Sequence, residues 1–244
     1  FLSSDYDISM NTIVTNMTLM RTVCNWVRKQ GVTNNDPFFG YDMPKALYGT
    51  PYFLTIQERD QVLDADLTDD AELAEYRDMF VFQCMVGCRH SDLVTFTPKN
   101  IIDGVLEYIP IKTKGKLGDV VRVPLIPKAM AILDGHDHGD DEPIFPKHYN
   151  FKFNDAIRRI LKRAKVNRVV TVINPKTRLE EKKPISDVAT SHLARRTFIG
   201  NLYRMVKDPD LVASMSGHAK GSVAFARYRV IDDDMKKSLV ELIQ

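Results

Sequence analysis

Cysteine is scarce in this chain of 244 residues, and a long apolar run is absent. The three cysteines (Cys24, Cys84 and Cys88) are an odd number without the spacing of a disulfide framework, which favours a reducing cytosol. No stretch approaches the length of a membrane-spanning helix, so no membrane partner is expected. Gly115-Lys116 lacks the Walker pattern of a phosphate-binding loop, and nucleotide hydrolysis therefore has no support.

Hydrophobic residues make up 44% of the chain and charged residues 27%, which is enough for one good core, or one core and a small second unit. The net charge of +2 hides an asymmetry, because residues 51–110 are strongly acidic and residues 111–244 hold most of the basic side chains. A basic C-terminal portion is typical of a surface that binds a polyanion. A solvated surface is the alternative, and charge alone favours it.

The N-terminal region predicts one long amphipathic helix over residues 9–30, with Gly31 just past its end. A turn-rich stretch follows, and we expect a domain boundary near residue 50. The first residues lack the basic-then-apolar layout of a signal peptide. Because one long helix is not a complete helical domain, we expect the chain to begin partway into a longer protein.

Residues 51–244 predict a mainly α fold with a small antiparallel β-sheet, an α+β domain. Thr55 and Glu58 form a capping box that opens a helix through about residue 66. The stretch 104–125 changes to a period of two and predicts a β-hairpin with a basic tip at Lys112–Lys116. Further elements are expected at 71–86, 127–134, 150–165, 168–186 (a second hairpin), 191–206, after the Asp208-Pro209 cap, at 221–229, and from Asp232 to the chain end.

Three positions stand out as candidates for phosphate chemistry. Tyr228 has an arginine on each side, an unusual setting for a core tyrosine, although plain packing remains the alternative. His192 and Arg195 are three apart on a predicted helix and share one face, as a surface salt-bridge pair or a core histidine also does. Arg89 follows an apolar helix and is expensive to bury without an anion or carboxylate, and Asp92 is a candidate partner that orients it.

Other candidates point less clearly to chemistry. Lys112 lies at the expected hairpin tip, where a flexible loop can deliver an ammonium group, but lysines usually make such turns soluble. The loop 134–141 has residue types that bind metals, yet its composition is that of an exposed loop. Cys84 and Cys88 fit core positions of an apolar helix. We therefore expect no metal.

Taken together and in order, these residues resemble the catalytic domain of the tyrosine recombinases, the phage integrase family. The resemblance covers roughly residues 51–244. It rests on the motifs Val86-Gly87-Cys88-Arg89-His90-Ser91-Asp92-Leu93, Lys112-Thr113, Ser191-His192-Leu193-Ala194-Arg195-Arg196-Thr197-Phe198, Ser216-Gly217-His218 and Ala226-Arg227-Tyr228. Residues 1–50 resemble the C-terminal part of that family's helical, SAM-like core-binding domain with a linker. The stretches 89–93 and 221–228 are most similar to integrases of conjugative or mobilizable transposons from Bacteroides-type bacteria.

The resemblance implies a DNA strand transferase that needs neither ATP nor another cofactor. Tyr228 is the implied nucleophile and forms a 3′-phosphotyrosyl intermediate. Arg89, Arg195 and His218 are implied to hold the phosphate oxygens, while His192 assists proton transfer. Lys112 is implied to protonate the leaving 5′-oxygen, but the long hairpin turn leaves Lys114 and Lys116 open as alternatives.

The implied partner is double-stranded DNA in the cytoplasm of a bacterium, bound by a homotetramer that is a monomer in free solution. Two alternatives stay open, a type IB topoisomerase that relaxes supercoils and a DNA-binding protein without catalysis. Neither the target sequence nor the crossover spacing can be deduced from the chain. Candidate contacts to DNA phosphates are Lys114, Lys116, Arg158, Arg159, Lys162 and Arg196.

Overall fold

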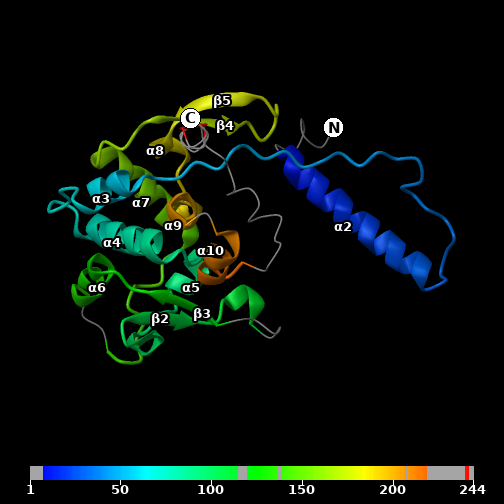
Figure 1. The fold of residues 1–244 in the computed structure, drawn as a ribbon. Coiled ribbons are helices and arrows are strands. Elements are labelled where there is room, and N and C mark those ends of the chain that lie inside the picture. The colour runs from blue at the N-terminus through cyan, green and yellow to red at the C-terminus, as the bar shows by residue number, and fades with distance from the viewer. Residues whose placement is uncertain (1–7, 115–119, 137–138, 207, 219–239, 242–244) are drawn as a thin grey trace. The chain divides into compact units, whose positions relative to one another are not determined.

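The computed structural model describes residues 8–114, 120–136, 139–206, 208–218 and 240–241. Its contacts divide the chain into two units, residues 1–50 with 171–183, and residues 51–170 with 184–244 (Figure 1). Helices dominate both the element order and the second unit, and the strands form two small antiparallel sheets. The predicted fold class, mainly α with a small antiparallel sheet, is confirmed.

The first unit contains helix α2 and most of a β-hairpin. Helix α2 (Met10–Lys29) confirms the helix predicted over 9–30, and its N-cap Ser9 accepts a hydrogen bond from the backbone of Thr12. The hairpin pairs β4 (Val169–Ile173) with β5 (Glu180–Pro184), as predicted for 168–186. Residues 171–183 belong by their contacts to this first unit, whereas the sequence placed the whole hairpin in the second domain.

Two hydrogen bonds explain why the hairpin belongs with the first unit. The Met10 N–H donates to the Pro175 carbonyl at 3.0 Å, so the hairpin turn meets the start of α2. The Arg178 guanidinium donates to the Lys45 carbonyl at 2.8 Å. Such contacts between distant segments leave no periodic pattern in the sequence.

The second unit opens with two capped helices. The capping box at Thr55 is present in both directions, and α3 (Ile56–Leu63) is three residues shorter than predicted. Asp70 caps α4 (Ala71–Val86), whose residues 79–86 are all buried. Helix α4 ends at Gly87, which adopts a left-handed conformation with a φ of 68°.

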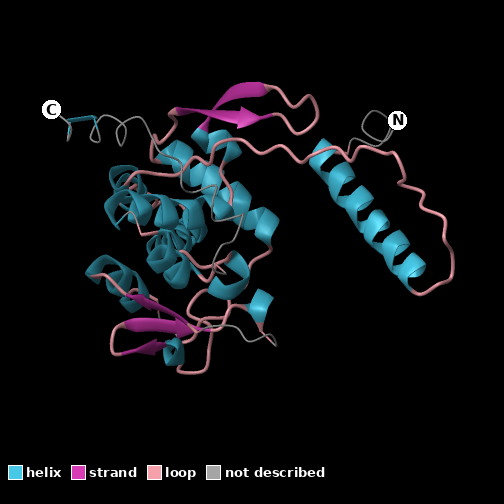
Figure 2. Ribbon diagram, turned by 45° about the vertical axis from the view of Figure 1, so that its right-hand side comes forward, coloured by secondary structure: helices cyan, strands magenta, loops and turns pink. Residues whose placement is uncertain are grey.

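Helices α7 and α9 pack against α4 and complete the helical layer (Figures 1 and 2). Helix α9 begins and ends where the sequence predicted, and α10 follows the predicted Asp208 cap. Short helices α5, α8 and η1 were not predicted. The bounds of these helices are α5 (His90–Leu93), η1 (Pro98–Asn100), α6 (Pro127–Asp134), α7 (Asn150–Arg163), α8 (Ile185–Val188), α9 (Ser191–Val206) and α10 (Pro209–Ser216).

A three-stranded antiparallel sheet lies at one end of this helical layer (Figure 2). Its strands are β1 (Ile101–Ile102), β2 (Val105–Tyr108) and β3 (Val121–Pro124). The pairing of β2 with β3 confirms the predicted hairpin, while β1 was not predicted. Strand β2 ends at Tyr108, and a short 3₁₀ turn, η2 (Ile111–Thr113), carries Lys112.

Alternation along the strands orients the sheet. Leu106 faces Val123 and Tyr108 faces Val121, and all four side chains are buried. Helix α10 packs between β3 and α9, so the sheet, the end of α10 and the start of α9 meet in one region. The predicted helix with Tyr228 lies outside the described residues, as does most of the predicted C-terminal helix, of which only residues 240–241 are described as helical.

Within the described ranges, no helix combines the length and apolarity needed to cross a membrane.

Gly87, the C-cap of α4, lies against the Phe198 side chain of α9, and we expect Gly87→Ala to lower the free energy of unfolding by about 2–4 kcal/mol. A methyl group at Gly87 would lie 2.2 Å from Cδ1 of Phe198, and its positive φ disfavours any side chain. Gly104 is the matched control, because its φ of 74° is equally unfavourable but a methyl group there meets nothing within 4 Å. Gly104→Ala should cost only about 1 kcal/mol. Equal losses in urea unfolding would show that the contact with Phe198 does not limit this position.

Candidate active site

A cavity of about 390 Å³ lies where α4, α5, α7 and α9 meet in the second unit. Arg89, His192 and Arg195 all line it, so the structure brings together three of the predicted catalytic residues. Arg89 comes from the loop that leaves α4, whereas His192 and Arg195 lie on the first turns of α9. The remaining lining residues are Gln83, Cys88, His90, Ser91, Asn150 and Ser191.

Arg195 is the most deeply buried of these cations, with only 1% of its surface exposed. Its Nη1 donates to the Gly87 carbonyl at 2.7 Å, and its Nη2 lies 3.0 Å from His218 Nδ1. A charged side chain is costly to bury unless its donors are satisfied. The left-handed turn at Gly87 directs a carbonyl at the guanidinium and thereby helps to stabilise it in the core.

Arg89 has a different environment. Its Nη1 is buried and has no hydrogen-bond partner among the described residues. Asp92, expected to orient Arg89, instead accepts a hydrogen bond from the Ile111 N–H at 2.9 Å. Asp92 is 1% exposed, so this contact ties the start of η2, and with it Lys112, to helix α5. The buried donor of Arg89 is therefore available to an anion in the cavity.

His192 follows the residue at which α9 begins. The Asn154 side chain of α7 accepts a hydrogen bond from the Ser191 N–H at 2.8 Å, which supplies an acceptor for the first turn of α9. Burial, and then the positive charge of Arg196, lowers the pKa of His192 to about 4. His192 is therefore neutral near pH 7.

His218 approaches the same cluster from the end of α10. Gly217 adopts a left-handed conformation with a φ of 64°, and the chain turns there so that the His218 N–H donates to the Ala213 carbonyl at 3.0 Å. Burial, and then the charge of Arg195, lowers the pKa of His218 to about 3. Lys112 contributes in the same direction, which places its ammonium charge within electrostatic reach of the imidazole.

Some of the predicted residues of the hairpin and of the C-terminal region lie in the described parts of the chain, and others do not. Lys112 and Lys114 are both exposed, and they lie in η2 and directly after it. Lys116 and Tyr228 lie outside the described residues. The structure thus assembles Arg89, His192, Arg195 and His218.

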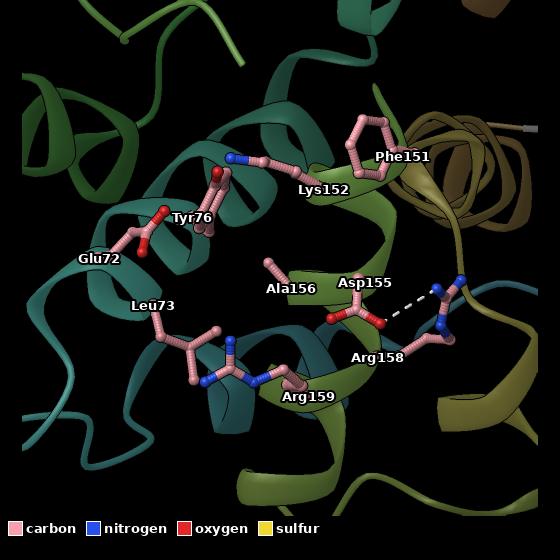
Figure 3. Close-up of a pocket in the computed structure, with 9 residues that line it drawn as sticks. All are labelled: Glu72, Leu73, Tyr76, Phe151, Lys152, Asp155, Ala156, Arg158 and Arg159. Atoms are coloured by element: carbon pink, nitrogen blue, oxygen red, sulfur yellow. Dashed lines mark hydrogen bonds and ion pairs between the residues drawn. The ribbon is translucent and has the colours of Figure 1, made fainter. Parts of the chain in front are cut away.

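The candidate DNA-binding residues of α7 already have carboxylate partners. A second cavity, of about 480 Å³, lies between α4 and α7, and Arg158 and Arg159 line it (Figure 3). Arg196 instead stacks over the Tyr52 ring, at 5.1 Å from its centroid. The ion pairs are Arg158–Asp155 at 3.3 Å, Arg159–Asp70 at 2.8 Å and Lys162–Asp187 at 2.8 Å. DNA phosphates therefore have to compete with these carboxylates.

Among the residues that the structure describes, metal-binding side chains do not gather into a site. His136, in the loop suspected from its composition, has its Nε2 3.7 Å from Asp78 Oδ2. No group of three or more histidine, cysteine, aspartate or glutamate side chains lies close enough to hold an ion in the described parts of the chain. Cys84 and Cys88 are core residues, and burial raises the pKa of both thiols.

Sequence reasoning missed several polar residues around the cavity. Gln83 is buried, and its amide donates to the Cys88 carbonyl at 3.0 Å. Its signal is a single polar residue inside the apolar run 79–86. Tyr108 is buried near the two arginines, and burial raises the pKa of its hydroxyl. Asn150 lines the cavity without any motif that singles it out, and Ser191 opens the motif of His192 and Arg195 but was given no role of its own.

Comparison with known proteins identifies the family of the chain. The phage integrase family matches residues 52–235. No curated protein sequence matches the chain.

Among solved structures, the Tn1549 transposon integrase in complex with circular intermediate DNA has a TM-score of 0.68 at 16% identity, over 98% of this chain and 81% of that one. A lambda integrase dimer bound to a core site has a TM-score of 0.59 at 16% identity, over 88% and 71%. XerA recombinase has a TM-score of 0.56 at 15% identity, over 100% and 80%. At these identities the likeness establishes the fold, and the family match, which spans most of the sequence, establishes that the chain belongs to the phage integrase family.

Proposed function

We propose that this tyrosine site-specific recombinase cleaves and rejoins double-stranded DNA at the cavity lined by Arg89, His192 and Arg195. The buried Nη1 of Arg89 carries the proposal, because it has no acceptor among the described residues. A non-bridging phosphate oxygen would supply that acceptor. A planar guanidinium that stays charged at any working pH suits a phosphate whose charge grows in the transition state.

The proposed reaction exchanges one phosphate ester for another. The Tyr228 oxygen attacks phosphorus, a bond forms between them, and the bond to the 5′-oxygen breaks with its electron pair on that oxygen. The product is a 3′-phosphotyrosyl link and a free 5′-hydroxyl. Attack by another 5′-hydroxyl reverses the step and releases Tyr228, so no ATP is consumed.

We assign the two proton transfers to the neutral imidazole of His192 and to the Lys112 ammonium group in η2. His192 is neutral near pH 7 and can accept the tyrosine proton. His218, also neutral, donates an N–H hydrogen bond to a phosphate oxygen. Lys112 protonates the leaving 5′-oxygen, and its charge, which acts on His218, supports this role.

The proposal extends to partners and domains. Residues 51–244 form the catalytic domain, and residues 1–50 are the end of a core-binding domain with a linker.

Four copies act together on DNA in the bacterial cytoplasm, and the free protein is a monomer. The source is a transposon of Bacteroides-type bacteria, as the stretches 89–93 and 221–228 indicate. Phosphate contacts come from Lys114, Lys116, Arg158, Arg159, Lys162 and Arg196.

Tyr228→Phe should abolish the covalent adduct that the parent forms with a nicked suicide duplex, because the attacking oxygen is removed. Tyr108→Phe is the matched control. Tyr108 is buried near Arg89 and Arg195, but the raised pKa of its hydroxyl makes it a poor nucleophile. It should still form the adduct. Denaturing gels detect the adduct, and peptide mapping identifies the modified residue. Attachment at any residue other than Tyr228 would refute the assignment, and strand exchange between two marked duplexes separates recombination from supercoil relaxation.

Arg89→Met should reduce the cleavage rate by about 10²–10³-fold without lowering the melting temperature in chloride. The methionine fills similar space and removes a buried donor that has no partner in the described part of the chain. Inorganic phosphate, compared with chloride at equal ionic strength, should stabilise the parent but not Arg89→Met.

Arg77→Met is the control for this change. Arg77 is half-buried, pairs with Asp78 at 2.9 Å and donates to the Ala65 carbonyl at 3.1 Å. Its replacement should lower the melting temperature and leave cleavage and the phosphate response intact. If Arg89→Met is still stabilised by phosphate, the anion does not bind at Arg89.

Removing Arg158, Arg159 and Lys162 together by alanine substitution should weaken DNA binding mainly at low salt. Removal of one phosphate contact reduces the slope of log K against log salt by about 0.9. Because all three side chains already pair with carboxylates, we expect the triple variant to lose less than three times this amount. Lys99→Ala with Lys128→Ala is the control, because both lysines also pair with carboxylates. The slope of log K against log salt is measured by fluorescence anisotropy. If it is unchanged in the triple variant, these residues of α7 do not contact DNA phosphates.

A further inference from the structure

Ser216 is the last residue of α10 and is fully buried, with 0% of its surface exposed. Its Oγ lies 2.9 Å from His218 Nδ1, 2.8 Å from the Val212 carbonyl and 3.2 Å from the Ala213 carbonyl. We propose that Ser216 is a positioning residue that holds the His218 proton on Nε2. The proposal rests on the phosphate-binding role proposed for His218.

The donors around Nδ1 carry this inference. The Arg195 guanidinium can only donate, and its Nη2 is closer to Nδ1 (3.0 Å) than to Nε2 (3.3 Å). The Ser216 hydroxyl lies on the same nitrogen at 2.9 Å. Of the two ring nitrogens, Nδ1 is the nearer to the guanidinium charge and the one within reach of the hydroxyl, so the lone pair belongs on Nδ1. In a neutral imidazole the proton is then on Nε2, and in the proposed role Nε2 donates it to a phosphate oxygen.

The Ser216 hydroxyl has a proton to give to Nδ1. Its other neighbours are carbonyls with backbone donors of their own, since the Ala213 carbonyl already accepts from the N–H groups of Gly217 and His218. The Val212 carbonyl lies four residues before Ser216 in α10, and the Ser216 N–H is its donor in the α-helical pattern. Donation to Nδ1 therefore leaves no carbonyl unsatisfied.

Substrate binding makes this hydroxyl more important. When Arg195 donates to a phosphate oxygen, its contact with Nδ1 weakens. The Ser216 hydroxyl is independent of the phosphate and continues to hold Nδ1 as an acceptor. A proton that moved to Nδ1 would remove the donor from Nε2, and a wrong tautomer of a catalytic histidine greatly slows other enzymes.

The backbone fixes the distance between the two side chains. Gly217 joins them in the left-handed conformation, and a methyl group there would lie 3.0 Å from Val121 Cγ2 and 3.2 Å from Pro110 Cγ. The turn is thus held by the sheet on one side. Because Ser216 is the last residue of α10 and the His218 N–H donates to the Ala213 carbonyl of the same helix, their relative position follows from local geometry.

The test compares Ser216→Ala with Ser214→Ala in the full chain. Ser214 lies in the same helix, and its hydroxyl donates to the Leu211 carbonyl at 2.7 Å, so this variant controls for a missing helix hydroxyl. Nitrogen-15 chemical shifts of the His218 ring, measured without DNA, report which nitrogen carries the proton. We expect the parent and Ser214→Ala to show the Nε2–H form, and Ser216→Ala to show a mixture or the Nδ1–H form.

Cleavage of the suicide duplex should fall about tenfold in Ser216→Ala and remain unchanged in Ser214→Ala, in line with the removal of one hydrogen bond. Ser216→Ala with the parent's nitrogen-15 pattern and cleavage rate would overturn the proposal for Ser216 while leaving the role of His218 untouched. If His218→Ala itself cleaves at the parent's rate, the proposed phosphate-binding role fails instead. Melting temperatures of the variants show whether either effect reflects unfolding.

Discussion

The burial of the Arg195 guanidinium is the constraint on which the active-site region depends. One of its nitrogens binds the Gly87 carbonyl and another faces His218, so a single side chain connects the end of α4, the start of α9 and the end of α10. A cation with 1% of its surface exposed is stable only if those partners are in place. The left-handed turns at Gly87 and Gly217 bring the partners there, and a side chain would clash with Phe198 at Gly87 and would crowd Val121 and Pro110 at Gly217. The geometry of the candidate site and the packing of the core therefore depend on the same contacts.

The electrostatics of the region follow from the same burial. Three arginines (Arg89, Arg195 and Arg196) and Lys112 act on two imidazoles that are partly removed from water, and both histidines stay neutral near pH 7. The candidate site is positively charged because of its arginines, while a neutral histidine is able to accept a proton or to donate a hydrogen bond. The buried Nη1 of Arg89 has no hydrogen-bond partner among the described residues, and a phosphate oxygen bound there would accept a hydrogen bond from it.

The charge asymmetry of the sequence has a structural counterpart. Acidic side chains from 51–110 pair with basic side chains from later in the chain, as in Arg159–Asp70, Lys128–Asp60 and Arg168–Glu58. Much of the apparent excess of each sign is thus neutralised inside the second unit. The basic character of α7 alone is therefore a weak guide to the DNA interface.

The sequence by itself determined the helices and hairpins, because helix caps, glycine stops and the change from a helical to a two-residue period are local signals. Helix α9 and the caps of α3 and α10 were predicted at the observed residues. It also indicated the order of the candidate site residues, through their resemblance to a family. Only the tertiary structure decided that Asp92 holds Ile111 and not Arg89, that the second hairpin belongs with the first unit, and that the cations of α7 pair with carboxylates. These are contacts between segments far apart in the chain, and their partners are chosen by packing, which no local pattern encodes.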